Sequence, residues 1–230
     1  GLRSFNRRMP EEINRVLTDH ACDLLLPPTE IALGHLAGEG LAHRSVVVGD
    51  VMADVLQRTL THVTAQPTGV RPSGDYLVAT IHRADNTDNP TLLADVMAAL
   101  QQLPIPVLLM AHPRLRTRAA EFDIQLEGGK VEVREPASYI EMVDLVAGCR
   151  GVITDSGGLQ KEAYLLGVPC TTVRTETEWV ETLTDGWNVL DPRAEHLAEL
   201  ASRLPPSKPR ADYFGDGNAA SRVVAELSGH

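Results

Sequence analysis

The sequence is poor in cysteine and aromatic residues and has no long apolar run. Its 230 residues include an aromatic share of 4%, no Cys-x-x-Cys pair and three cysteines, Cys22, Cys149 and Cys170. An odd, small number of cysteines beside apolar residues argues against a disulfide framework and indicates reduced thiols in a cytoplasmic protein. Because no apolar run approaches the ~20 residues that span a bilayer and no signal peptide is visible, we expect no membrane insertion.

Basic residues are also in the minority. Lys and Arg number 21 against 31 Asp and Glu, for a formal net charge of −10. A chain this acidic repels phosphate backbones, so we expect no nucleic-acid partner, although a local pocket can oppose the global charge and bind a small anion. The sequence also lacks the His and Cys clusters of metal sites, a Walker A loop and a Gly-x-Ser-x-Gly elbow, so we predict no metal site.

Short apolar runs alternate with amphipathic stretches along most of the chain. Several runs are apolar on both faces, as in buried parallel strands, and the alternation predicts βαβ units. The predicted strands are 23–26, 45–48, 76–80, 107–110, 130–133, 151–154 and 170–173. The predicted helices are 10–21, 50–62, 90–103, 138–147, 158–166, 194–204 and 219–228. Two stretches without periodicity, 64–73 and 204–217, predict joints between parts of the chain.

The segment 151–163 is the strongest candidate for binding. A buried strand ends at Thr154, a Gly turn follows, and a helix begins near Gly158. Ligands of open α/β sheets bind at the carboxyl ends of strands, and a helix N-terminus offers N–H groups and a positive dipole end to a diphosphate. Ser156 can add a hydroxyl, and Gly157 lets the backbone approach a ligand. The alternative is a plain strand–turn–helix with Ser156 as its N-cap, which leaves no capping box.

Three other strand ends carry polar side chains, and each has an ordinary explanation. His82 and Arg83 suit acid–base or phosphate chemistry, but the same stretch fits a turn before the next helix. At the next strand end, His112 and Arg114 could face the same crevice, but a helix that begins at a proline also explains them. The third strand end could line a polar site or could simply be a solvated loop. That third strand end carries Arg174, Glu176 and Glu178.

A possible catalytic carboxylate opens the first predicted helix. Either Glu11 or Glu12 could fill that role, directly after Pro10. The alternative is structural, because proline at the first helical position and acidic residues in the first turn are what a helix favours.

Taken together, these segments resemble the non-hydrolysing UDP-N-acetylglucosamine 2-epimerases in order and spacing. The matches run from the first residues to about Leu190, and the two most specific are 154–164 and 174–181. The full set is Pro-Glu-Glu-Ile-Asn-Arg (10–15), Pro-Thr-Glu (28–30), Val-Val-Gly-Asp-Val (47–51), Thr-Ile-His-Arg-Ala-Asp-Asn (80–86), His-Pro-Arg (112–114), Glu-Pro-x-x-Tyr (135–139), Thr-Asp-Ser-Gly-Gly-Leu-Gln-Lys-Glu-Ala-Tyr (154–164) and Arg-x-x-Thr-Glu-Trp-Val-Glu (174–181).

The resemblance implies an α/β fold of two Rossmann-like domains, as in type B glycosyltransferases, with the N-terminal one incomplete in this chain. Residues 1–65 would end that domain, 66–205 would form the UDP-binding domain, and 206–230 would pack back across the domains. The implied reaction interconverts UDP-GlcNAc and UDP-ManNAc by anti elimination of UDP, through 2-acetamidoglucal, and re-addition. It needs no cofactor. Family members are commonly homodimers that serve cell-surface polysaccharide synthesis.

The resemblance also assigns roles to individual residues. Glu11 matches an active-site carboxylate, and His82 matches the active-site histidine of the His-Arg motif. Other positions match the substrate site: Ser156, Gly157 and Gly158 at the diphosphate, Glu162 at the ribose, Met142 at the uracil, and Arg83, Arg174, Glu176 and Glu178 at its border. His112 and Arg114 match a second, regulatory UDP-GlcNAc site of some bacterial members.

The chain departs from the family pattern in two places. His-Arg-Ala-Asp-Asn (82–86) replaces the commoner His-Arg-Arg-Glu-Asn, which removes an arginine from the region of the regulatory site. The N-terminal Gly-Thr-Arg-Pro-Glu motif and two further active-site carboxylates are missing, so we expect little or no epimerase activity from this chain alone. Three alternatives remain: a hydrolysing relative that releases ManNAc and UDP, a non-catalytic nucleotide-sugar-binding module, and a type B glycosyltransferase, which the paired motifs favour less.

Overall fold

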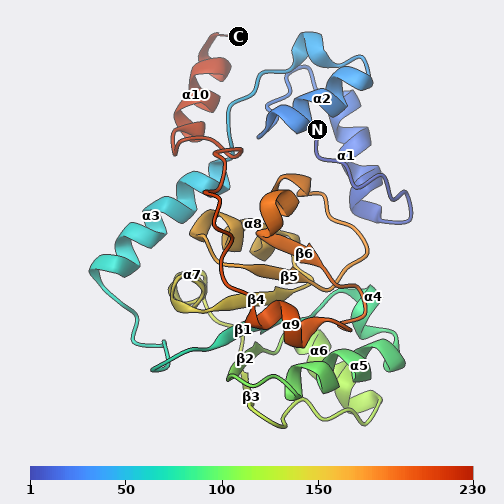
Figure 1. The fold of residues 1–230 in the computed structure, drawn as a ribbon. Coiled ribbons are helices and arrows are strands. Elements are labelled where there is room, and N and C mark those ends of the chain that lie inside the picture. The colour runs from blue at the N-terminus through green and yellow to red at the C-terminus, as the bar shows by residue number, and fades with distance from the viewer. Residues whose placement is uncertain (230) are drawn as a thin grey trace. The chain divides into compact units, whose positions relative to one another are not determined.

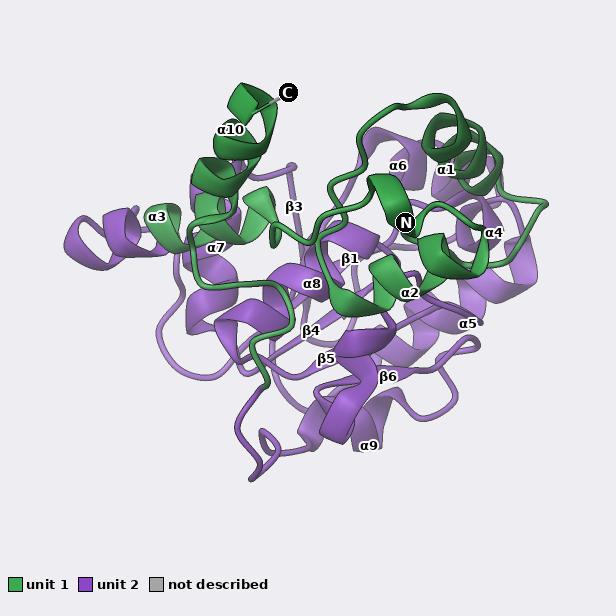
Figure 2. Ribbon diagram, turned by 90° about the horizontal axis from the view of Figure 1, so that it is seen from above, with its two compact units in different colours: residues 1–59, 211–230 green, residues 60–210 purple. Residues whose placement is uncertain are grey.

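The computed structural model describes residues 1–229 and divides into two compact units. Unit 1 comprises Gly1–Thr59 and the C-terminal segment from Ala211, and unit 2 comprises Leu60–Arg210 (Figure 2). The boundary falls inside helix α3 (Val51–Ala65). Among the residues described, no helix has the length and apolar character needed to cross a bilayer.

Unit 2 is built on a six-stranded sheet of order β3-β2-β1-β4-β5-β6, and every neighbouring pair is parallel. The strands predicted after residue 75 are all present, and β6 is an additional one. Their bounds are β1 Leu77–Thr80, β2 Val107–Met110, β3 Val131–Arg134, β4 Gly151–Thr154, β5 Cys170–Thr172 and β6 Asn188–Leu190. The order reverses direction between β1 and β4, and such a switch point leaves a crevice at the carboxyl ends of the strands.

Helices cover both faces of this sheet (Figure 1). Successive strand residues point to opposite faces, so Leu77 packs with helices α5, α6 and α9, whereas Val78 packs with α7 and α8. Both faces are therefore buried in the middle of the sheet, which explains why β2 is continuously apolar, whereas the edge strand β3 alternates with charged residues. The helices are α4 Ala84–Thr87, α5 Pro90–Gln101, α6 Pro113–Glu121, α7 Tyr139–Gly148, α8 Gly157–Leu166, the 3₁₀ segment η2 Val180–Gly186, and α9 Leu197–Ser202.

Side-chain caps determine where the longer helices begin and end. The Asn89 side chain accepts hydrogen bonds from the backbone N–H groups of Thr91 and Leu92 at the start of α5. Ser138 and Glu141 form a reciprocal capping box on α7. Helix α8 ends at Gly167, whose φ of +72° lies in the left-handed region that glycine tolerates. The predicted helix 194–204 is shorter, and at its start Ala194 has a φ of +58°, which lies outside the right-handed helical region.

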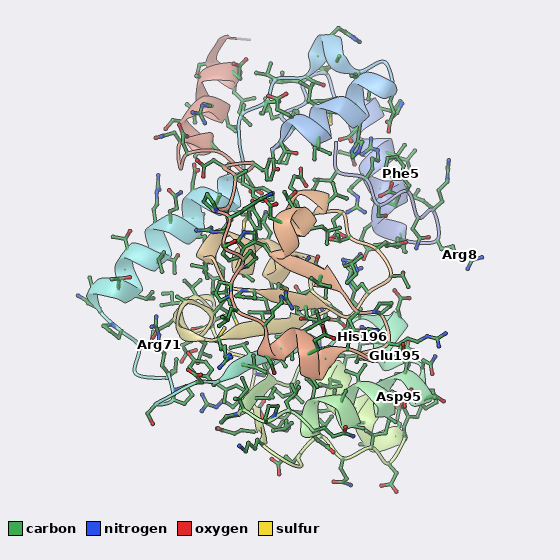
Figure 3. All side chains as sticks on the ribbon, in the orientation of Figure 1. Phe5, Arg8, Arg71, Asp95, Glu195 and His196 are labelled. Carbon is green, nitrogen blue, oxygen red and sulfur yellow. The ribbon has the colours of Figure 1, made fainter. Side chains whose placement is uncertain are left out.

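The buried carboxylate of Asp144, on α7, holds the loop that precedes β1 against that helix. The Asp144 side chain has no exposed surface and accepts hydrogen bonds from the Thr68 backbone N–H at 2.9 Å, the Thr68 hydroxyl and Arg71 Nε at 2.5 Å. Arg71 lies on this loop (Figure 3). Burial acts to raise the pKa of Asp144, but these hydrogen bonds and the arginine charge outweigh it and lower the pKa. Donors on the loop thus stabilise the buried charge of Asp144, and that charge in turn holds the loop in place.

The three cysteines are free thiols. Cys170 is fully buried on β5, and Cys22 and Cys149 are partly buried. Burial raises the pKa of both Cys149 and Cys170 to about 12, so these two groups stay protonated near neutral pH. This agrees with the prediction of reduced, structural cysteines.

Unit 1 is mainly helical. Its elements are α1 Pro10–Ala21, α2 Glu30–Gly38, the 3₁₀ turn η1 Ala42–Arg44, the first part of α3, and α10 Ala219–Gly229. A small core of Leu25, Leu36 and Leu41 holds α2 and its flanking segments together. The predicted helices at 10–21, 50–62 and 219–228 are confirmed within a few residues.

The strands predicted at 23–26 and 45–48 are wrong as regular strands. The two segments share a single isolated parallel bridge between Leu25 and Ser45. Leu25 N–H donates to Arg44 O at 2.8 Å, and Val46 N–H donates to Leu25 O at 2.9 Å. Pro27 and Pro28 follow immediately, and proline has no N–H to extend such a ladder.

Candidate functional site

A pocket of about 260 Å³ lies at the carboxyl ends of the strands in unit 2. It occupies the region of the switch point between β1 and β4, where open α/β sheets bind ligands. Its lining residues are Thr80 and His82 at the end of β1, Met110 and His112 at the end of β2, Pro136, Ala137 and Met142 around the start of α7, the α8 N-cap Ser156, and Gly158, Leu159 and Glu162 on α8.

The N-terminus of α8 forms one wall of the pocket. Ser156 is the N-cap, and its hydroxyl accepts a hydrogen bond from Leu159 N–H at 3.4 Å, as the capping alternative predicted. The first turn of a helix leaves N–H groups without helical acceptors and carries a positive partial charge. A Cβ on Gly158 would meet only the Ser156 hydroxyl, at 3.9 Å, so the backbone there is open to an approaching group. Capping and anion binding are therefore compatible at this end.

Glu162 and Met142 also line the pocket. Glu162 lies further along α8 and is half-buried, and burial raises its pKa although the Lys161 charge partly opposes this. Met142 faces the pocket from α7. A carboxylate beside an apolar surface can accept hydrogen bonds from hydroxyl groups while a flat ring packs against the thioether.

His82 lies in the pocket wall beside a buried carboxylate. The His82 Nδ1 atom is 3.4 Å from Asp155 Oδ1, and its ring centroid is 5.7 Å from that of His112. Asp155 also accepts hydrogen bonds from the backbone N–H groups of His82 and Arg83. Sequence reasoning did not single out Asp155, although an acidic residue directly after a buried strand was a usable signal.

Four further predicted residues lie together next to the pocket without lining it. The Glu178 carboxylate is 2.9 Å from Arg174 Nη1 and 3.8 Å from Arg83 Nη2, and it is only 8% exposed. Burial acts to raise the pKa of Glu178, but the arginine charges outweigh this and lower it. The carboxylate also packs against Gly157, where a Cβ would lie 2.5 Å from Glu178 Oε1. Two guanidinium groups thus share one carboxylate behind the N-terminus of α8.

The two residues predicted for a regulatory site differ in their surroundings. His112 lines the pocket and caps α6, where its Nδ1 accepts from Arg114 N–H at 3.2 Å. The Arg114 guanidinium donates to Thr87 Oγ1 at 2.9 Å and to both carboxylate oxygens of Asp88. A regulatory site at these residues stays a prediction.

The two candidate carboxylates in the first turn of α1, in unit 1, have different surroundings. Glu11 is exposed. Glu12 is buried and accepts hydrogen bonds from the backbone N–H groups of Ser4 and Phe5, each at 2.9 Å, and from Arg15 Nη2 at 2.9 Å. Glu12 therefore has a structural explanation, and Glu11 is the one open to a ligand. Its catalytic role stays a prediction.

A larger hollow of about 730 Å³ in unit 2 suits an anionic ligand poorly. It lies between α5 and the segment before α9, and its walls include Arg193 and the carboxylates of Asp95 and Glu195, which Figure 3 labels. The start of α5 also lines this hollow, but there the Asn89 side chain already accepts hydrogen bonds from the first free N–H groups. The two carboxylates outnumber the one guanidinium group and repel a diphosphate, whereas the helix N-terminus in the strand-end pocket is open at Gly158. We therefore assign the candidate site to the smaller pocket.

Comparison with known proteins points to one family. The sequence profile of the family described as UDP-N-acetylglucosamine 2-epimerase matches residues 1–228. The UDP-2,3-diacetamido-2,3-dideoxy-D-glucuronate 2-epimerase of Pseudomonas aeruginosa is 42% identical, over 99% of this chain and 66% of its own length. The UDP-N-acetylglucosamine 2-epimerase of Methanocaldococcus jannaschii is 36% identical, over 99% and 67%. The chain thus spans about two thirds of the length of these curated relatives.

Solved structures agree with this result. The crystal structure of the Methanocaldococcus jannaschii enzyme in complex with UDP-GlcNAc and UDP has a TM-score of 0.89 and 36% identity, and covers 100% of this chain and 67% of its own. The Neisseria meningitidis enzyme bound to UDP-GlcNAc shares the fold, with a TM-score of 0.85 at 23% identity. The predicted fold class, two Rossmann-like domains of which this chain covers part, is confirmed.

Proposed function

Because this chain belongs to the UDP-N-acetylglucosamine 2-epimerase family, we propose that its strand-end pocket binds the UDP portion of a UDP-sugar that is epimerised at C2. The observation that carries the proposal is the pairing of an open helix N-terminus at Ser156–Gly158 with Glu162 further along the same helix. The first feature suits a diphosphate, and the second suits the two hydroxyls of a ribose. The uracil then packs against Met142.

The proposed substrates are UDP-GlcNAc and UDP-ManNAc. A base removes the C2 proton while the C1–oxygen bond to UDP breaks, which leaves 2-acetamidoglucal. UDP then adds back to C1, and a proton returns to C2 from the other face. Glu11 is the proposed carboxylate in proton transfer, and His82 is proposed to act beside the diphosphate. A fixed positive environment at the departing diphosphate lowers the barrier to this elimination.

Binding of UDP to the 230-residue chain tests the first half of the proposal. All residues that line the proposed UDP pocket lie in unit 2, so binding is the step that this chain tests directly. We expect calorimetry to detect UDP binding and Glu162→Gln to weaken it about tenfold, since a hydrogen bond to a charged group contributes about 1.5–3 kcal/mol. Glu199→Gln, at an exposed position on α9, is the matched control. Equal affinity in both variants would contradict the assignment.

Deuterium incorporation at C2 of UDP-GlcNAc in heavy water tests the second half, and we expect little or none from the 230-residue chain alone. Robust incorporation by this chain would contradict that expectation, and its appearance together with UDP-ManNAc would support epimerisation. Release of free ManNAc and UDP would favour the hydrolysing alternative.

A second candidate substrate follows from the Pseudomonas aeruginosa relative. That protein is named for a UDP-sugar with a second acetamido group and a uronate carboxylate, and it is 42% identical to this chain. Both candidates share the UDP portion, so the UDP experiment does not separate them. Competition between UDP-GlcNAc and UDP-2,3-diacetamido-2,3-dideoxy-D-glucuronate for the wild-type chain does, because the tighter ligand identifies the preferred sugar.

A further inference from the structure

Asp155 is a buried charge at the end of β4. Its side chain has no exposed surface. Its carboxylate accepts hydrogen bonds from His82 N–H at 3.0 and 3.1 Å, from Arg83 N–H at 2.9 Å and from Asn86 Nδ2 at 3.0 Å. A buried carboxylate needs such donors, because desolvation costs several kcal/mol. All of them come from the segment that follows β1.

This arrangement ties together the two strands that flank the switch point. Asn86 Nδ2 also donates to Val173 O at 2.9 Å, so the segment after β1 is anchored to β4 through Asp155 and to the end of β5 through Val173. The backbone of His82 has little freedom as a result. A side chain on a fixed backbone, packed in a pocket wall, keeps a restricted set of orientations.

The imidazole ring of His82 faces the same carboxylate. Nδ1 lies 3.4 Å from Asp155 Oδ1, a separation at which a contact commonly tightens when ligand binds. A hydrogen bond at one ring nitrogen sets which nitrogen carries the proton. With Nδ1 turned to Asp155, Nε2 is the nitrogen left for a ligand in the pocket.

We infer that Asp155 is a positioning residue that holds His82 with its proton on Nδ1, so that Nε2 faces the bound UDP-sugar. The identity of the ligand as a UDP-sugar rests on the proposed function. The predicted tautomer and orientation of His82 do not, because they follow from its contact with Asp155. In this arrangement, neutral His82 accepts a proton from solvent water at Nε2. The resulting cation donates that proton to an oxygen of the departing diphosphate, which returns His82 to its neutral form with the proton on Nδ1. The nearby carboxylate stabilises that cation without taking up a proton itself.

A purely structural role is the competing explanation, because Asp155 also anchors the backbone. Two variants separate the roles. Asp155→Asn keeps the size of the side chain and removes its charge. Asn86→Ala removes another hydrogen-bond partner of Asp155 and leaves the His82–Asp155 contact in place. Circular dichroism shows whether each variant is folded.

The measurement is the pair of ¹⁵N chemical shifts of the His82 ring, assigned by comparison with His82→Gln. In the wild-type chain we expect the tautomer with the proton on Nδ1. In Asp155→Asn the ratio of the two tautomers should shift about fivefold toward Nε2–H, since a hydrogen bond to a charged acceptor is roughly twice as strong as one to a neutral acceptor. Asn86→Ala should keep the wild-type tautomer even where it lowers stability.

Three results would overturn the inference: Nε2–H in the wild-type chain, an unchanged tautomer in folded Asp155→Asn, or an equal shift in Asn86→Ala. The first of these is decisive even if Asp155→Asn fails to fold. UDP binding to the wild-type chain is measured in the same samples. Its absence would refute the proposed function and leave the tautomer result standing, so the two failures are distinguishable.

Discussion

Replacement of Gly157 by alanine tests the packing behind the N-terminus of α8. A Cβ at this position would lie 2.5 Å from Glu178 Oε1 and 3.3 Å from Glu178 Cδ. The carboxylate would have to move by roughly 1 Å to restore an ordinary contact. It is held 2.9 Å from Arg174 Nη1, and both side chains are less than 10% exposed. The movement therefore disturbs a buried ion pair.

The expected cost follows from that confinement. Overpacking of a buried site costs about 1–3 kcal/mol. For a chain of this length, a loss of about 2 kcal/mol lowers the midpoint of thermal unfolding by about 4–8 °C. We also expect UDP affinity to fall, because the displaced Glu178 carries Arg174 with it.

Gly158→Ala is the matched control for stability, measured by thermal unfolding followed by circular dichroism. Its Cβ would meet only Ser156 Oγ at 3.9 Å, and alanine favours a helix over glycine by about 1 kcal/mol. We expect Gly158→Ala to melt at or above the wild-type temperature. A Gly157→Ala protein that melts as high as Gly158→Ala would refute the argument.

The clash itself is isolated by a double-mutant cycle. Glu178→Ala removes the atoms that the new Cβ meets, so Gly157→Ala should lose most of its effect in that background. We expect a coupling free energy of about 1–3 kcal/mol between the two positions. Additive effects would show that Gly157 acts through something other than Glu178.

Three further predictions concern titratable groups and an unpaired hydroxyl. Burial raises the pKa of Glu162 above the ordinary value of 4.5, so the folded state favours the protonated form. Denaturant unfolding should show Glu162→Gln gaining stability over wild type as pH rises above that value, and no gain below it. The lowered pKa of Asp144 has the opposite sign, so Asp144→Asn should lose about 2 kcal/mol at neutral pH by weakening the contacts to Thr68 and Arg71, and the loss should shrink as pH falls through the carboxylate titration. The Tyr139 hydroxyl is buried and has no hydrogen-bond partner among the described residues, so thermal unfolding of Tyr139→Phe should show a free energy of unfolding that is unchanged or higher by about 1 kcal/mol at most.

Local sequence determined the strands of unit 2 and the caps of its helices. Apolar runs such as 107–110 are buried on both faces, so their pattern is independent of which neighbour they pair with. The same reasoning failed at 23–26, where the apolar run is equally clear. A regular strand needs a continuous series of backbone N–H donors. The run at 23–26 is followed by Pro27, which has no N–H, and only the single bridge between Leu25 and Ser45 forms.

One wall of the strand-end pocket could also be predicted from the sequence. Ser156, Gly158 and Glu162 belong to one strand–turn–helix segment, so the local geometry of that segment sets their positions relative to one another. These residues form a pocket only together with residues at the ends of β1 and β2, which the tertiary fold brings to the same place.

The supporting charges were decided by tertiary structure alone. Asp155 and His82 are separated by 73 positions in the chain, and Glu178 meets Gly157 from a separate loop. An isolated Asp or Glu in a sequence fits a turn, a cap or a solvated surface equally well. Only the folded sheet removes these carboxylates from water, and their buried charge then has to be matched by the N–H groups and guanidinium groups that the fold brings to them.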